Sequence, residues 1–126
     1  MKISHLDHLV LTVSDIYNSI EFYTKVLGFE LVIFHDRKAL KFGNQKINLH
    51  QKGNEFEPKA EKPTTGSADL CFIAETKIED ILTELKQQDI KIIEGIVERT
   101  GASGKIKSIY FRDPDFNLVE VSNYIN

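Results

Sequence analysis

A repeat of pattern, rather than of residues, is the feature that most limits how this chain can fold. The segment from His8 to Leu11 and the segment from Asp69 to Phe72, 61 positions later, are both typical of short strands. Each is followed by an amphipathic helical pattern and then by further short strand-like segments. Because strand lies on strand and helix on helix at a constant offset, the sequence predicts an α+β fold of two tandem βαβββ modules.

The two expected helices begin and end at recognisable signals. Ser14-Asp15 supplies an N-cap signal for the first helix, whose apolar residues recur over 16–27, and Gly28 ends it. In the second helix, Thr76 and Glu79 fit a capping box, in which the two side chains satisfy free amides reciprocally.

The remaining segments are expected strands and turns. Strands are expected at residues 6–13, 29–35, 39–42, 46–50, 69–74, 90–93, 105–111 and 118–121. Residues 99–104 are expected to form a loop and 113–115 a tight turn, in which Phe116 is not expected to have a positive φ. We expect one domain over 1–126, with module one at about 4–51, a connector at about 52–66 and module two at about 67–124.

Charge and composition exclude several classes of function. The formal charge of −3 offers no basic surface for nucleic acid or for an anionic membrane. No apolar run approaches the roughly 20 residues that span a bilayer, and the first residues lack an export signal. With a single cysteine, an internal disulfide is impossible, so we expect a reduced, cytoplasmic protein.

Strand parity places imidazole and carboxylate groups on the faces opposite the helices. His8, His50, Asp69 and Glu120 all have this parity. If both helix-free faces turn toward a common space, the modules form a partly open, eight-stranded, barrel-like cleft where these groups converge. Such a set is typical of a divalent metal site, and a wet cleft with salt bridges is the alternative.

Three segments carry a resemblance to a known family. The run from His8 to Asp15, the helix end from Phe22 to Phe29, and the segment from Tyr110 to Glu120 resemble the vicinal oxygen chelate superfamily. This superfamily includes glyoxalase I, fosfomycin-resistance proteins, bleomycin-resistance proteins and extradiol dioxygenases. Residues 99–104 followed by 108–115 are similar to a small-protein subgroup described as glyoxalase-like or dioxygenase-like.

The resemblance implies a ligand set for a divalent metal, whether Mn, Ni, Zn, Mg or Fe. By position, His8 is the ligand from module one and Glu120 the ligand from module two. Asp69 stands where glyoxalases usually have histidine, and Asn48 or His50 stands where glyoxalase I has a carboxylate. Aspartate makes a harder, more oxygen-rich site than a second imidazole would, and leaves room for a metal-free relative.

Further side chains are candidates for substrate binding. They are Arg99, Ser108, Tyr110 and Arg112. An arginine beside glycines suits an anionic group, and the serine and tyrosine share one face of their strand. Cys71 shares the parity of Asp69, but we expect it to be a packed apolar thiol.

These features favour a metal-dependent, glyoxalase-type lyase or isomerase acting on a small oxygen-chelating molecule. Glu120 would be both a ligand and the catalytic base. The alternative is a metal-free binding protein of the bleomycin-resistance type, using Arg99, Tyr110 and Phe116, and an extradiol-dioxygenase-like enzyme ranks third. The resemblance also implies a homodimer, with the cleft closed within one chain or between two.

Overall fold

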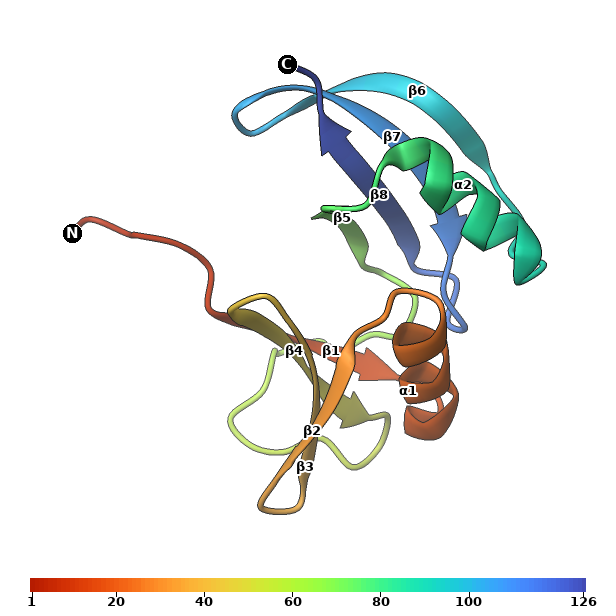
Figure 1. The fold of residues 1–126 in the computed structure, drawn as a ribbon. Coiled ribbons are helices and arrows are strands. Elements are labelled where there is room, and N and C mark those ends of the chain that lie inside the picture. The colour runs from red at the N-terminus through yellow and green to blue at the C-terminus, as the bar shows by residue number, and fades with distance from the viewer. The chain divides into compact units, whose positions relative to one another are not determined.

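The chain consists of two compact units, each holding one helix and one four-stranded mixed sheet (Figure 1). The structure, a computed structural model, describes residues 1–126, and the units are Met1–Gly66 and Ser67–Asn126. Each unit has the element order βαβββ, which confirms the predicted α+β repeat. Neither helix is long and apolar enough to cross a membrane.

Module one is built on a sheet in which the first and last strands are neighbours. Its elements are β1 (His8–Val13), α1 (Ile16–Lys25), β2 (Glu30–Phe34), β3 (Arg37–Phe42) and β4 (Gln45–Gln51). The strand order is β1-β4-β3-β2, with β1 parallel to β4 and the other pairs antiparallel. Apolar side chains on one face of this sheet, such as Leu49, are buried together with Tyr23 of α1.

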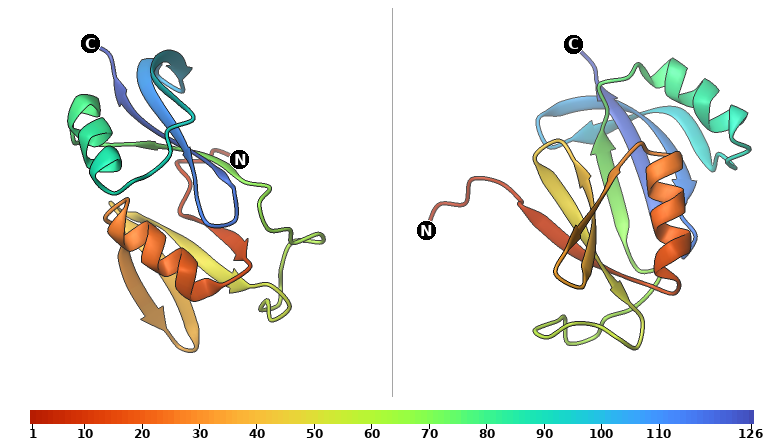
Figure 2. Two further views of the ribbon diagram at one scale, coloured as in Figure 1. Left: turned by 90° about the vertical axis from the view of Figure 1, so that its right-hand side faces the viewer. Right: turned by 60° about the horizontal axis from the view of Figure 1, so that its bottom comes forward.

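Module two repeats this arrangement. Its elements are β5 (Asp69–Ile73), α2 (Ile78–Gln87), β6 (Glu94–Gly101), β7 (Gly104–Arg112) and β8 (Leu118–Tyr124). The strand order is β5-β8-β7-β6, again with the first and last strands parallel. Ile109, Phe111 and Val119 are fully buried, and α2 packs on β7 and β8. The ribbon shows the helix on one side of this sheet (Figure 2). In each module one face of the sheet is covered by its helix.

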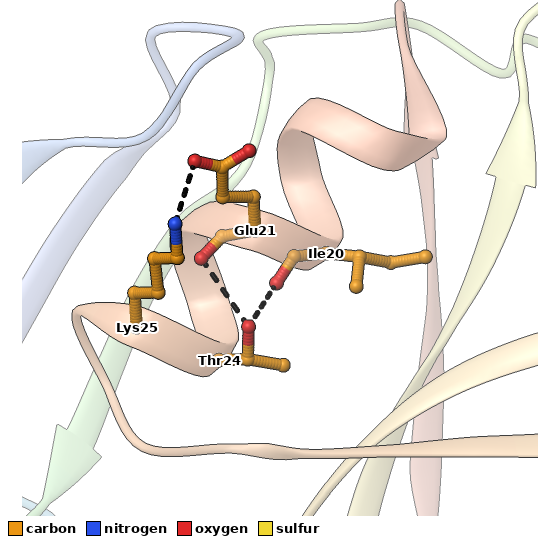
Figure 3. A network of polar contacts seen from close by, with 4 residues as sticks. All are labelled: Ile20, Glu21, Thr24 and Lys25. Carbon is orange, nitrogen blue, oxygen red and sulfur yellow. Dashed lines mark hydrogen bonds and ion pairs between the residues drawn. The ribbon is translucent and has the colours of Figure 1, made fainter.

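The first helix begins at the predicted Ser14-Asp15 signal, and Asp15 is its N-cap residue. The Asp15 carboxylate accepts hydrogen bonds from the backbone amides of Tyr17 and Asn18, as an N-cap does. On its exposed side, Lys25 forms an ion pair with Glu21 at 3.0 Å, and the Thr24 hydroxyl donates to the carbonyl of Ile20 (Figure 3). An exposed pair of this kind contributes only a few tenths of a kcal/mol, so the buried face of α1 provides most of its stability.

A side-chain amide from the last strand clamps the start of the helix in both modules. Gln51 on β4 accepts from the amide of Ile16 at 2.9 Å and donates to the carbonyl of Ser14 at 2.6 Å. Asn123 on β8 accepts from the amide of Ile78 at 2.7 Å and donates to the carbonyls of Ala74 and Thr76. The modules thus share a structural device that different residues supply.

The predicted capping box at the start of the second helix is wrong, and the clamp from Asn123 takes its place. Lys77 is the N-cap residue of α2, and its side chain makes no capping hydrogen bond. The free amide at the start of α2 is satisfied from β8, 45 residues away in the chain, so no local pattern could reveal it.

Replacing Asn123 by alanine is expected to lower the free energy of unfolding by about 2 kcal/mol, because the substitution leaves one amide and two carbonyls without their partner. Thr76→Ala, which would remove a true cap, is expected to change it by less than about 0.5 kcal/mol. Urea unfolding of both variants measures this difference, and a larger loss in Thr76→Ala would contradict the clamp.

Two expectations about β6 are wrong. Residues 90–93 do not form a strand, because Asp89, with a φ of 55°, ends the helix in a left-handed conformation and the strand register with β7 begins at Glu94. Arg99 lies in β6 rather than in a loop, since β6 continues to Gly101 and only Ala102 and Ser103 form the hairpin turn.

The turn between β7 and β8 is present as predicted, but the expectation for Phe116 is wrong. Its φ is 65°, in the left-handed region, although its ring is exposed. Asp113 fixes this turn: its carboxylate accepts from the amides of Asp115 and Asn117, and its carbonyl accepts from the amide of Phe116. These hydrogen bonds impose the conformation in spite of the side chain.

Candidate functional site

Glu120 lies on the open face of the module two sheet, between neighbours on both sides. In the strand register it is opposite Cys71 on β5 and Tyr110 on β7. The hydroxyl of Ser108, which is fully buried, donates to Glu120 Oε2 at 2.5 Å, and Ser122 lies 2.7 Å from Ser108. A half-buried carboxylate is thus held in a fixed orientation by a charge-assisted hydrogen bond.

Tyr110 connects Glu120 to a cation on the same face. Arg99 Nε donates to the Tyr110 hydroxyl oxygen at 3.1 Å, and an Arg99 terminal nitrogen lies 3.1 Å from a carboxylate oxygen of Glu94. Burial raises the pKa of Tyr110, Glu120 raises it further and the hydrogen bond from Arg99 opposes the rise. Tyr110 therefore stays a neutral phenol between an acid and a guanidinium.

Cys71 and Asp69 occupy the same open face on β5. Asp69 is exposed and pairs with Leu118, so it is the diagonal neighbour of Glu120. Cys71 is exposed, with Sγ 3.5 Å from the Ser122 hydroxyl, so the expectation of a packed apolar thiol is wrong. Partial burial of the thiol and the nearby charge of Glu120 raise its pKa, which keeps it in the less reactive protonated form.

His8, at the start of β1, is oriented by the residue before it. Its Nδ1 lies 2.7 Å from a carboxylate oxygen of Asp7, and this hydrogen bond lowers the pKa of Asp7. A carboxylate on Nδ1 leaves Nε2 as the ring nitrogen for another partner, which is the arrangement found behind most histidine metal ligands. Asp7 is not among the predicted site residues, although it directly precedes His8 in the chain.

The strand register identifies the counterpart of Glu120 in module one. His8 pairs with Lys46, as Asp69 pairs with Leu118, so Asn48 and Glu120 each lie two residues farther along the last strand. The side-chain oxygen of Asn48 is buried and has no hydrogen-bond partner. An unsatisfied oxygen at this position marks a place where a ligand or cation would be stabilised.

His50 lies elsewhere on the module one sheet. It pairs with Thr12, four residues beyond His8 on β1, which is a separation of roughly 13 Å along the strand. The ring is buried and contacts Phe56 edge-on, with 5.6 Å between ring centroids. Burial, followed by the charge of Arg37, lowers the pKa of His50, so the ring is neutral at pH 7.

Three of the other predicted residues lie on the same sheet face as Glu120: Ser108, Tyr110 and Arg99. The fourth, Arg112, is exposed at the end of β7, and its guanidinium donates to the carbonyl of Phe116 at 3.4 Å. Glu94, the partner of Arg99, had not been predicted, because its alignment with Tyr110 depends on an irregularity in β6 after Gly95. The structure gathers no group of three His, Cys, Asp or Glu side chains that could hold a metal ion.

The fold and the site together define a class of protein. The chain has two βαβββ modules, and their open sheet faces carry histidine, carboxylate and hydroxyl groups, as in vicinal oxygen chelate proteins. The model of the Glyoxalase/Bleomycin resistance protein/Dioxygenase superfamily matches residues 5–121. The chain belongs to this superfamily.

Three relatives align with nearly the whole chain. Virulence protein STM3117 of Salmonella typhimurium is 63% identical over 99% of this chain and 88% of its own length. Glyoxalase domain-containing protein RDO1 of Mycosarcoma maydis is 54% identical over 98% of this chain and 70% of its own. Metallothiol transferase FosB of Staphylococcus epidermidis is 30% identical over 96% of this chain and 82% of its own.

Solved structures agree with the fold. The crystal structure of the Salmonella protein has a TM-score of 0.98 to this chain and covers 99% of it and 100% of that chain. Lactoylglutathione lyase from Agrobacterium tumefaciens has a TM-score of 0.75 at 23% identity, covering 98% of this chain and 96% of that one, and shows likeness of fold alone.

Proposed function

We propose that this chain is a divalent-metal-dependent, glyoxalase-like enzyme of lyase or isomerase type that acts on a small oxygen-chelating substrate. The observation that carries the proposal is the Glu120 carboxylate, held by Ser108 on an open sheet face next to Tyr110 and Arg99. A carboxylate in the middle of a sheet contributes little to packing, and desolvating it is costly. A role in binding or proton transfer accounts for its position.

The residues present fit a divalent metal by their chemistry. His8 offers Nε2 while Asp7 holds Nδ1, and Glu120 offers a carboxylate fixed by a serine. Asp69 is our choice for the third ligand, because it is the diagonal neighbour of Glu120, whereas His50 lies four residues beyond His8 along the sheet. This donor set of one imidazole and two carboxylates suits Mn²⁺, Fe²⁺, Mg²⁺, Ni²⁺ or Zn²⁺.

When bound, such a metal supplies Lewis acidity to two substrate oxygens. In this proposal Glu120 would take a proton from the carbon beside the substrate carbonyl, and the hydrogen bond from Ser108 to Glu120 Oε2 supports this role by fixing the carboxylate. Tyr110 and Arg99 would bind substrate oxygens, a role that the affinity of a guanidinium for anionic groups supports.

The relatives support metal chemistry of this kind. FosB is named a metallothiol transferase, and RDO1 is named for a glyoxalase domain. A metal bound through oxygen and nitrogen donors and a thiol co-substrate are therefore part of the proposal for this chain.

We also propose a cytoplasmic homodimer. His8 comes from module one and Asp69 and Glu120 come from module two, so the proposed ligand set needs both modules, from one chain or from two copies. Val10 and Ile73, on the open faces of β1 and β5, are about half exposed, and such apolar side chains favour a covering surface.

Metal binding is expected to stabilise the protein and to depend on His8. Protein freed of metal by a chelator should gain several degrees in Tm on adding Mn²⁺, Ni²⁺ or Zn²⁺, because a ligand that binds only the folded state stabilises it. His8→Gln should lose most of this gain. His5→Gln is the matched control, since His5 is also an exposed histidine and lies three residues away.

Metal analysis of protein purified without chelator complements the thermal measurement. Bound metal near one equivalent per chain is the expected result. No bound metal, with stabilisation only by anionic or aromatic molecules, would overturn the proposal and favour a binding protein of the bleomycin-resistance type.

A further inference from the structure

Strand β6, at the edge of the module two sheet, contains one extra residue near its start (Figure 1). Between Gly95 and Val97 the register with β7 shifts by one residue, so Ile96 is unmatched. This is a β-bulge, a feature that re-aims side chains and is common beside active sites. Glycine suits the position before it, because a Cβ on Gly95 would lie 3.0 Å from Cγ1 and 3.1 Å from Cα of the buried Ile109.

The bulge brings Glu94 and Arg99 to one face of the sheet. In a regular strand, residues an odd number of positions apart lie on opposite faces, as these two would. With the extra residue, Glu94 pairs with Tyr110 and Arg99 pairs with Ile106, which share a face of β7. An Arg99 terminal nitrogen accordingly lies 3.1 Å from a carboxylate oxygen of Glu94. The ion pair therefore depends on the bulge.

Stability alone does not account for this ion pair. The Arg99 side chain is 39% exposed and the Glu94 side chain 52% exposed, and exposed pairs of this kind stabilise a fold very little. A bulge also interrupts the ladder of backbone hydrogen bonds. The orientation that the pair gives to the guanidinium is the effect that remains to explain it.

Glu94 holds one side of a guanidinium whose other side contacts Tyr110. Arg99 Nε donates to the Tyr110 hydroxyl oxygen at 3.1 Å, and one terminal nitrogen donates to the carbonyl of Glu98 at 3.0 Å. The other terminal nitrogen is the one that faces Glu94. Each of the three nitrogens of Arg99 thus has a partner within module two, so the planar group is fixed in orientation.

The contact from Arg99 also decides where the Tyr110 proton points. Because the hydroxyl oxygen accepts from Nε, its own O–H is directed away from the guanidinium. Glu94 is engaged by Arg99, which leaves Glu120, the register partner of Tyr110 on β8, as the carboxylate facing this hydroxyl. A hydroxyl that accepts from a cation is also a stronger donor, since hydrogen bonds in a chain polarise one another.

We propose that Glu94 is a positioning residue, which fixes Arg99 so that Tyr110 presents its hydroxyl proton to a substrate oxygen beside Glu120. This inference rests on the proposed function, in which Tyr110 and Glu120 act on the same small substrate. The hydrogen bond from Tyr110 stabilises negative charge that develops on that oxygen. Glu94 does not touch the substrate and acts only through Arg99 and Tyr110.

NMR of the arginine Nε–H groups tests the positioning on the full chain, freed of metal by a chelator. The chain has three arginines, and Arg99→Lys assigns the Arg99 signal. We expect the Arg99 Nε–H to exchange with water at least about tenfold more slowly than that of the exposed Arg112, because it is hydrogen-bonded. Glu94→Gln should speed the Arg99 exchange about fivefold or more. Glu98→Gln, an exposed carboxylate on the same strand, is the matched control and should leave the rate unchanged.

A double-mutant cycle measures the consequence for the proposed activity, with a hemithioacetal of an α-ketoaldehyde and a thiol as substrate. Glu94→Gln should lower kcat about tenfold and leave metal affinity and the melting curve unchanged. Tyr110→Phe removes the donor itself. The double variant should be no slower than Tyr110→Phe alone, because Glu94 acts through Tyr110.

Failure of this inference and failure of the proposed function give different results. Unchanged Arg99 exchange in Glu94→Gln, or kinetic losses that add in the double variant, would overturn the role of Glu94 while the wild type stays active. An inactive wild type with metal bound would overturn the proposed function, and the exchange rates would then still decide whether Glu94 fixes Arg99.

Discussion

Glu120→Gln is expected to lower metal affinity by at least about 100-fold and to abolish glyoxalase-type proton transfer. Loss of a partner behind a ligand already costs roughly 10- to 100-fold, and this change removes the charge of a proposed ligand and base together. Glutamine has the same length, and its amide oxygen can still accept from Ser108, so the sheet should be preserved. Competition with a metal-sensitive dye measures the affinity.

Glu98→Gln, on strand β6 of the same sheet, is the matched control for this experiment. Its side chain is exposed and should leave both metal affinity and activity unchanged. Activity is measured on a hemithioacetal of an α-ketoaldehyde and a thiol. Full metal affinity in Glu120→Gln, with an unchanged melting curve, would show that Glu120 is not a ligand.

Asp113→Ala is expected to be the most destabilising of the substitutions discussed, at about 3–4 kcal/mol. The buried carboxylate accepts from the amides of Asp115 and Asn117 and from the Asn117 side chain at 2.8 Å, and charge-assisted bonds of this kind contribute most. Asn117 in turn accepts from the amide of Ala68 at 2.8 Å. The substitution therefore loosens both the β7–β8 turn and the entry to β5.

Thermal unfolding followed by circular dichroism measures this loss, and a fall in Tm of about 10 °C or more is expected. Asp36→Ala, in the exposed turn between β2 and β3, is the control and should change Tm by only a degree or two. An equal effect of the two substitutions would contradict the role of Asp113.

Much of the fold was predictable because strand parity and helical periodicity are local consequences of burial. Leu49 and Val119 were assigned to the helix-covered faces and are buried there. Glu120 was assigned to the open face, where the register places it next to Tyr110. The N-cap signal at Ser14-Asp15 was predictable because the amides that Asp15 binds are two and three positions away.

Predictions failed where a distant partner decided the local conformation. Thr76 looked like a cap, but Asn123 from β8 satisfies the start of α2. Arg99 looked like a loop residue because glycines surround it, yet pairing with β7 keeps it in a strand and directs it to Tyr110. Phe116 has a positive φ because Asp113 holds the turn on both sides.

The sequence by itself determined the two-module plan, the element types and the face on which each chemical group lies, since all of these follow from periodicities of two and 3.6 residues. Only the tertiary structure decided which groups are neighbours: Asp69 beside Glu120, Asn48 as the counterpart of Glu120, and His50 opposite Thr12. The physical reason is that parity assigns a face, whereas the register between strands, set by packing and turns, assigns a position on that face.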